Sequence, residues 1–272
     1  MRNPLYSPQM VNDSWSDFLH GSAPSGHAVQ IYSDVAELTR SVSSYLAAGF
    51  ELGEHAVVIA TPEHLAEFAA ALAAIGWHEA RIERAGLLAT ADADETLAAI
   101  MGGFDMPSAR AFEEVIGGLL DRFPSTQARA FGEMVDLLWR RDQRDAAFAL
   151  EELWNDLVRR RPFSLLCAYH INVFDRESQA DTMPHVCRAH SHVLPAPDPA
   201  RLQRAVDQAL EEVLGAREAG KVYVLVAQEI RADRVPMAQV LLMWISENMP
   251  ALAERVLAAA RARYLAEPVA SV

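Results

Sequence analysis

The sequence has little cysteine and no long apolar run. Only Cys167 and Cys187 occur among the 272 residues, which excludes a framework of several disulfides. The longest apolar segments are much shorter than the roughly 20 residues that a membrane span requires. Residues 1–25 also lack the apolar stretch that is typical of a signal peptide. We therefore expect a cytoplasmic protein that does not enter a membrane.

Basic residues are also few. Lys and Arg together number 24 against 37 Asp and Glu, and the net charge is −13 at pH 7. Nucleic-acid binding relies on clustered positive charge that contacts phosphates. Residues 198–272, where a C-terminal binding region would lie, are close to neutral rather than basic. We do not expect direct binding to nucleic acid.

Motifs for catalysis and for phosphate binding are missing from the sequence. The first expected strand is followed by Tyr32-Ser33-Asp34 and not by a glycine-rich turn that ends in Gly-Lys-Ser/Thr. Asp34 would place negative charge where a phosphate needs hydrogen-bond donors. The motifs GxSxG, CxxC, HExxH and GxGxxG do not occur either. We therefore expect neither an enzyme nor a bound cofactor.

Short apolar segments alternate with amphipathic helical patterns from residue 26 to residue 175. Strands are expected at residues 27–32, 56–60, 86–89, 128–135 and 163–169. Asp34 and Thr61 are suited to cap the helices that follow the first two strands, and Pro62 is suited to the first helical turn. This alternation predicts an α/β fold, a mostly parallel sheet with helices on both faces.

The domain organisation is predicted from changes in composition along the chain. Residues 1–25 are expected to be a partly ordered lead-in, residues 26–175 an α/β domain, and residues 176–199 a proline-containing linker with one short ordered segment. Residues 200–272 are predicted to be a small helical region, in which residues 222–226 suit a strand as well as a helix. Helical spacing of four apolar residues suggests a dimerising seam, formed by Leu202, Val206, Ala209 and Val213.

The chain from Gly26 to Asp175 resembles the MEDS domain, a sensory domain of methanogen and methylotroph regulators that include one responding to dichloromethane. The resemblance rests on several segments in the expected order, HAVQIY, GEHAVVIATPEH, RAFGEMVDLLW, LEELWN and FSLLCAY. The trailing segment VCRAHSHVLP is also similar to the segment that often comes after such domains. The chain departs from the family at His170, because proline usually follows the CAY strand there.

This resemblance implies a fold similar to the RecA/KaiC ATPases but without the phosphate loop. It also places Glu133 where those ATPases carry an acidic residue that supports magnesium. Without a phosphate loop, Glu133 receives no magnesium role. The crevice at the carboxyl ends of the strands would instead hold a small organic effector, such as a hydrocarbon derivative.

The candidate ligand-binding residues lie at or near the expected strand ends. They are His27, Tyr32, Asp34, Thr61, Glu133, Trp139, Trp154 and Tyr169. The alternative for both tryptophans is packing in the core, and His27 suits a structural role. Glu133 follows an apolar strand, so it is either exposed or paired with Arg129 or His27.

One segment resembles a metal site by composition. Its candidate ligands are His185, Cys187, His190 and His192, which Cys167 and His170 could approach. The spacing matches no standard zinc finger, so we expect no metal. A redox-sensing thiol at Cys187 is the other use of this segment, since neighbouring His and Arg residues would lower its pKa.

The sequence therefore favours a non-catalytic, cytoplasmic sensory protein. Its α/β domain would bind a small organic effector and signal through the helical region to a regulatory protein partner, with a homodimer as the expected assembly. The alternative is an interaction scaffold in which the former crevice has become a docking face. An enclosed pocket would favour the sensor, and a filled crevice with an exposed patch would favour the scaffold.

Overall fold

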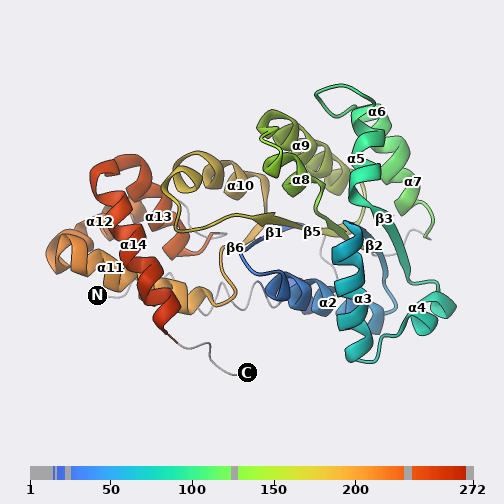
Figure 1. Ribbon diagram of the computed structural model, residues 1–272, viewed down its shortest axis with the longest axis horizontal. Coiled ribbons are helices and arrows are strands. Elements are labelled where there is room, and N and C mark those ends of the chain that lie inside the picture. Colours follow the sequence, from blue (N-terminus) through green and yellow to red (C-terminus); the bar gives the residue numbers. More distant parts are fainter. Residues whose placement is uncertain (1–14, 16, 22–25, 124–127, 230–234, 268–272) are drawn as a thin grey trace. The chain divides into compact units, whose positions relative to one another are not determined.

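The structure is a computed structural model that describes residues 15, 17–21, 26–123, 128–229 and 235–267 (Figure 1). These residues divide into two compact units. The sheet unit runs from residue 16 to 170 and includes residues 189–191. The helical unit comprises Trp15 together with the described residues of 171–188 and 192–267. Most of the predicted lead-in lies outside the described residues.

Five parallel strands form the centre of the sheet unit. They are β1 (Gly26–Tyr32), β2 (His55–Ala60), β3 (Leu88–Asp92), β4 (Ala128–Gly132) and β5 (Phe163–His170). Their order in the sheet is β3-β2-β4-β5-β1. A further short strand, β6 (His192–Leu194), belongs to the helical unit. Strands β1, β2, β4 and β5 are buried almost throughout, as expected when both faces of a parallel sheet are covered. The predicted parallel sheet is confirmed.

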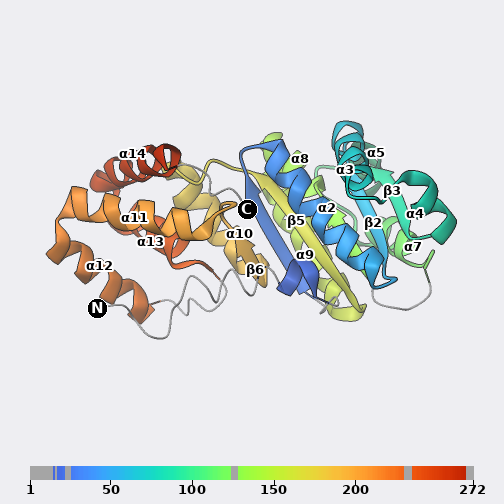
Figure 2. The ribbon, with the colours of Figure 1, turned by 90° about the horizontal axis from the view of Figure 1, so that it is seen from below.

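Helices cover both faces of this sheet (Figures 1 and 2). They are α2 (Val35–Glu51), α3 (Pro62–Ala74), α4 (Glu79–Ala85), α5 (Ala93–Met101), α6 (Ala109–Phe112), a π-helical turn (Glu113–Gly117), α7 (Gly118–Leu120), α8 (Met134–Arg140) and α9 (Arg144–Arg160). From α3, Phe68 meets Phe131 on one face of β4. From α9, Trp154 lies beside Gly132 on the other face, because alternate strand residues point to opposite sides. The α/β class is therefore also confirmed.

Local chemistry explains where the first helices start. The Asp34 carboxylate accepts a hydrogen bond from the Ala36 amide at 2.9 Å and caps α2. The Thr61 hydroxyl caps α3, with Pro62 in the first turn. Both caps are as predicted. The third strand begins later than predicted, because Gly86 adopts a left-handed conformation (φ 63°) that ends α4.

The strand predicted at residues 128–135 is also shorter in the structure. It ends at Gly132, and α8 begins at Met134. The strand and the first turn of α8 are both buried, and apolar residues continue across their border, so periodicity does not mark it. As a result, Glu133 stands between a strand end and a helix start.

The helical unit contains the remaining helices. They are a π-helical turn (Ser178–Thr182), α10 (Met183–Ala189), α11 (Pro199–Leu214), α12 (Ala216–Glu229), α13 (Met237–Asn248) and α14 (Pro250–Ala266). Much of the expected linker, residues 176–199, is therefore helix or strand. The segment 222–226 is helical, with Val222 and Val226 buried one turn apart. Among the helices that the structure describes, none has both the length and the apolar composition for crossing a membrane.

The apolar face of α11 is used inside the helical unit. Leu202, Val206 and Ala209 are fully buried and belong to one apolar core with residues of α13 and α14. Side chains that already pack within one chain are not available to a second copy. The structure therefore does not place the proposed dimerising seam on this face of α11.

Candidate functional site

Polar and aromatic side chains gather where the parallel strands of the sheet unit end. We call this set the strand-end cluster, which consists of Tyr32, His64, Glu133, Asp136 and His170. Tyr32 and His170 are the last residues of β1 and β5. Glu133 follows β4, and His64 lies in the first turn of α3. The carboxyl ends of open α/β sheets are the usual place for ligands.

Glu133 is fully buried at this edge. Its carboxylate accepts a hydrogen bond from the Thr61 amide and pairs with the Nδ1 atom of His64. The partner expected from the sequence was Arg129 or His27, and that expectation is wrong. A histidine one helical turn beyond the neighbouring strand β2 takes this role, because β2 and β4 are adjacent and end at the same edge.

Arg129 forms a different buried ion pair. Its Nε atom donates to Glu54 at 2.7 Å, and its Nη1 atom donates to the carbonyl oxygens of Leu19 and Tyr45 at 2.6 and 2.9 Å. The Arg129 side chain is fully buried. These contacts satisfy the charge of Arg129 without Glu133, so this network is structural.

Asp136 is a second fully buried carboxylate, one turn beyond Glu133 in sequence. It accepts hydrogen bonds from the Tyr32 hydroxyl at 3.1 Å and from the His170 amide at 2.9 Å. The Nε atom of Arg140 lies 3.1 Å from the same carboxylate. Asp136 was not among the residues predicted from the sequence, although an acidic residue within the apolar segment GEMVDLLW is a signal for a buried, partnered carboxylate.

The environment changes the protonation behaviour of this cluster. The hydrogen bond between His64 and Glu133 raises the pKa of His64, and burial of His64 lowers this pKa by a smaller amount. Burial raises the pKa of Asp136, while the His170 amide, Arg140 and the Tyr32 hydroxyl oppose this shift. Burial and the nearby Asp136 carboxylate also raise the pKa of Tyr32. Tyr32 therefore stays a neutral hydrogen-bond donor at physiological pH.

The other predicted ligand residues lie elsewhere. Asp34 is an exposed helix cap. Trp154 is 1% exposed and packs edge-on against Phe112 with 5.0 Å between ring centroids, which is the predicted core alternative. Trp139 is partly buried, and its ring lies 6.2 Å from that of Tyr169. Of the eight predicted residues, Tyr32, Thr61 and Glu133 come together at the strand ends.

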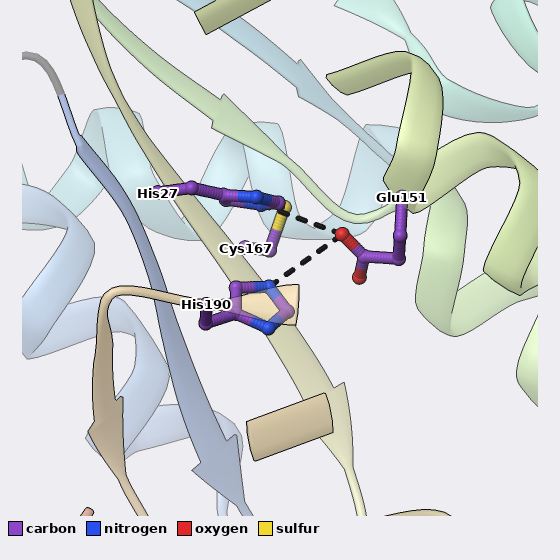
Figure 3. Close-up of side chains that lie close together, drawn as sticks. All are labelled: His27, Glu151, Cys167 and His190. Carbon is purple, nitrogen blue, oxygen red and sulfur yellow. Dashed lines mark hydrogen bonds and ion pairs between the residues drawn. The ribbon is translucent and has the colours of Figure 1, made fainter. Parts of the chain in front are cut away.

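Four further side chains meet in the interior of the sheet unit (Figure 3). We call them the buried quartet, which consists of His27, Glu151, Cys167 and His190. Each offers one possible ligand atom, and these atoms all lie within 4.8 Å of one another. His27 is on β1, Cys167 on β5 and Glu151 on α9, whereas His190 follows α10. All four residues are buried.

The distances within the quartet are short. The Nε2 atom of His27 lies 3.1 Å from the Cys167 sulfur and 3.4 Å from Oε2 of Glu151. The Nε2 atom of His190 lies 3.6 Å from the same Glu151 oxygen. In Figure 3 the four side chains point toward a shared space.

Burial also dominates the titration of the quartet. It lowers the pKa of His27 to about 3, with a further lowering by His190. It raises the pKa of Glu151 and of the Cys167 thiol. The uncharged forms are therefore favoured when these groups are alone in the core.

The local His/Cys segment predicted as a possible metal site does not assemble as a unit. Only His190 of that segment joins the quartet, together with Cys167, which was expected to approach. His185 instead contacts Arg188 at 3.2 Å. Burial raises the pKa of Cys187 to about 12, and Arg188 opposes this only in part. The prediction of a low pKa for the Cys187 thiol is therefore wrong, because the effect of burial outweighs that of the neighbouring Arg188.

Most of the chain matches one known protein family. The family described as the methanogen/methylotroph, DcmR sensory domain (MEDS) matches residues 26–191, which is more than half of the chain. The chain belongs to the MEDS family. This match extends beyond the predicted boundary at residue 175 and takes in His190, the last residue of the quartet. A search of curated proteins found no match. The likeness to RecA/KaiC ATPases stays a prediction.

Proposed function

We propose that this MEDS protein is a cytoplasmic sensor that binds a small organic effector over the strand-end cluster. The observation that carries the proposal is the pair of fully buried carboxylates, Glu133 and Asp136, at the edge where open α/β sheets bind ligands. Burying ionisable groups is costly, and groups of this kind cluster at functional sites. Membership of a sensory-domain family supports the same role.

The accessible side chains in the cluster, and Arg140 beside it, suggest how an effector is held. His170 is exposed, the Arg140 side chain is 45% exposed and that of His64 is 12% exposed. All three carry N–H donors, while the ring of Tyr32 lies 5.2 Å from that of His170. We expect an effector with an oxygen acceptor and a small apolar body that contacts these rings.

Signalling would follow from competition for Arg140. An acceptor group on the effector draws Arg140 away from Asp136, and α8, which carries both residues, then favours a second arrangement. The helical region transmits this state to a regulatory protein, and the assembly is a homodimer. Val224 and Leu225 on α12 are 58% and 43% exposed and form an apolar surface suited to such a partner. No catalytic step is part of this proposal.

One observation favours the interaction scaffold. Glu133 and Asp136 already have protein partners, so the strand-end cluster is complete without a ligand. In that case the edge would dock a protein and not enclose a small molecule.

Native mass spectrometry of the full chain, isolated from its source cells, tests the proposal. We expect the wild-type chain to retain a small organic molecule, and Arg140→Met to lose it. Arg141→Met is the matched control, because Arg141 is adjacent, similarly exposed and paired with Asp94 outside the cluster. Retention by both variants contradicts the strand-end site. A wild-type chain with bound protein and no small molecule supports the scaffold.

A further inference from the structure

We propose that the buried quartet is a binding site for one divalent transition-metal ion of the zinc type. The ligands are Nε2 of His27, an oxygen of Glu151, Sγ of Cys167 and a ring nitrogen of His190. All four belong to the sheet unit. This site is separate from the strand-end cluster and does not depend on the effector.

The spacing of the ligand atoms fits a tetrahedral ion. Zinc bonds to nitrogen, oxygen and sulfur ligands are about 2.0–2.3 Å long, so neighbouring ligands around the ion are about 3.3–3.8 Å apart. The separations of 3.1 and 3.4 Å from His27, and of 3.6 Å between His190 and Glu151, are close to this range. All four ligand atoms lie within 4.8 Å of one another. The four atoms therefore surround a space that suits one ion.

The donor types select the class of metal. Calcium and magnesium prefer oxygen ligands and would not choose a thiolate with two imidazoles. A set of two nitrogens, one sulfur and one oxygen suits a borderline ion such as Zn²⁺ or Co²⁺. A dication beside the Cys167 thiolate, the Glu151 carboxylate and two neutral imidazoles gives a site without net charge. Such a balance removes the main cost of burying these groups.

Neighbouring residues already orient two ligands. The Nδ1 atom of His27 lies 3.0 Å from Oδ1 of Asn155, which fixes the ring and turns Nε2 into the quartet. The Tyr169 hydroxyl donates to Oε1 of Glu151 at 2.7 Å. Among the described residues, Oε2 of Glu151 accepts no hydrogen bond although it is buried and faces the two histidines. Hydrogen-bond partners such as Asn155 and Tyr169 commonly hold metal ligands in place.

Four protein ligands close the coordination sphere, so the ion would be structural and not catalytic. It would join β1, β5 and α9 to the segment 189–191. This segment is already held to β1, because the Ser191 amide donates to the His27 carbonyl oxygen at 2.6 Å. The ion would therefore fix the end of the MEDS domain to its first strand.

Cobalt titration of the full chain tests the site. The protein is stripped with a chelator under reducing conditions, and Co²⁺ is then added without oxygen. We expect one Co²⁺ to bind per chain. The visible absorption bands should be as strong as those of tetrahedral Co²⁺ sites, and a thiolate-to-cobalt charge-transfer band should appear. Cys167→Ser should lose the charge-transfer band. Cys187→Ser is the matched control and should keep it, because Cys187 is the other cysteine and lies outside the quartet.

Competition with Zn²⁺ measures the affinity. We expect Asn155→Ala, which removes an orienting partner, to weaken binding by roughly 10- to 100-fold, and Cys167→Ser to weaken it by more. The proposal is wrong if folded wild-type chain takes up no Co²⁺, or if Cys167→Ser keeps the charge-transfer band. Should Cys167→Ser not fold, X-ray absorption of the zinc-loaded wild-type chain decides. One sulfur at about 2.3 Å supports the site, and a shell without sulfur overturns it.

Discussion

The buried ion pair of Arg129 and Glu54 allows a quantitative test of what holds the sheet unit together. Arg129→Met keeps much of the volume of the side chain but leaves the Glu54 carboxylate, 6% exposed, without its cation. Removing one partner of a buried ion pair costs about 3–5 kcal/mol. The carbonyl oxygens of Leu19 and Tyr45 also lose their donor. We therefore expect a loss of stability at or above this range, a large share of the about 5–15 kcal/mol typical of a domain.

Urea unfolding followed by tryptophan fluorescence measures this loss. Three of the five tryptophans report on the sheet unit, namely Trp77, Trp139 and Trp154. Arg129→Met should lower the urea midpoint at an unchanged slope. The double variant Glu54→Gln/Arg129→Met should be more stable than Arg129→Met alone, because it no longer buries a carboxylate that has lost the Arg129 cation.

Arg110→Met provides the matched control. Arg110 also pairs with a glutamate, Glu114, at 2.8 Å, but its side chain is 88% exposed. Solvent screens such a pair, so the urea midpoint should stay within experimental error. Equal midpoints for Arg129→Met and Arg110→Met, or a double variant less stable than Arg129→Met alone, would refute a structural role for the buried pair.

Two further predictions concern packing and pH. Gly49→Ala should lower the stability of the fold by about 1–3 kcal/mol, because the new Cβ would lie 2.6 Å from Cδ of the buried Arg129. The control Gly220→Ala places its Cβ in open space on a helix and should raise stability by about 0.5–1 kcal/mol. Calorimetry measures both changes, and equal effects would contradict the close approach at Gly49. The raised pKa of His64 means that its pairing with Glu133 stabilises the fold fully below the unfolded-state pKa, about 6.5. This contribution is lost as pH rises through the folded-state pKa. His64→Gln should remove that part of the pH profile, and an unchanged profile would contradict the pairing.

The fold was predictable because its strands are buried on both faces. Continuous apolar runs such as those of β2 and β5 stand out from the amphipathic helices between them. Borders were less predictable. Gly86 ends a helix that was not predicted from the sequence, and the buried first turn of α8 looked like a continuation of β4. In both cases local composition did not mark the border between helix and strand.

The strand-end cluster was predictable only in part. Its members Tyr32 and Glu133, and Thr61 beside them, follow from the rule that parallel strands end at one edge. His64 and Asp136 were missed because each lies on the first turn of a helix, beyond the strand end itself. Helical geometry returns such residues to the edge, so the third or fourth residue after each strand end belongs among the candidates.

The buried quartet was not accessible from sequence spacing. His27 and His190 are 163 positions apart, and their ring centroids lie 4.1 Å from each other. The compact segment from His185 to His192 attracted the metal hypothesis because its members are close in sequence. Only the parallel pairing of β1 with β5, and the return of the chain at Ser191, bring the actual partners together.

Solvent access separates the roles of the three buried charge networks in the sheet unit. The Arg129 network and the buried quartet are enclosed, so an effector could reach neither without opening the core. The strand-end cluster also contains buried carboxylates, but exposed Arg140 and His170 contact one of them, Asp136, and connect it to solvent. A molecule at the surface can therefore act on buried Asp136 by displacing a single side chain. This combination of a buried charge and an exposed partner is why we propose the effector site at the strand ends and the metal site in the interior.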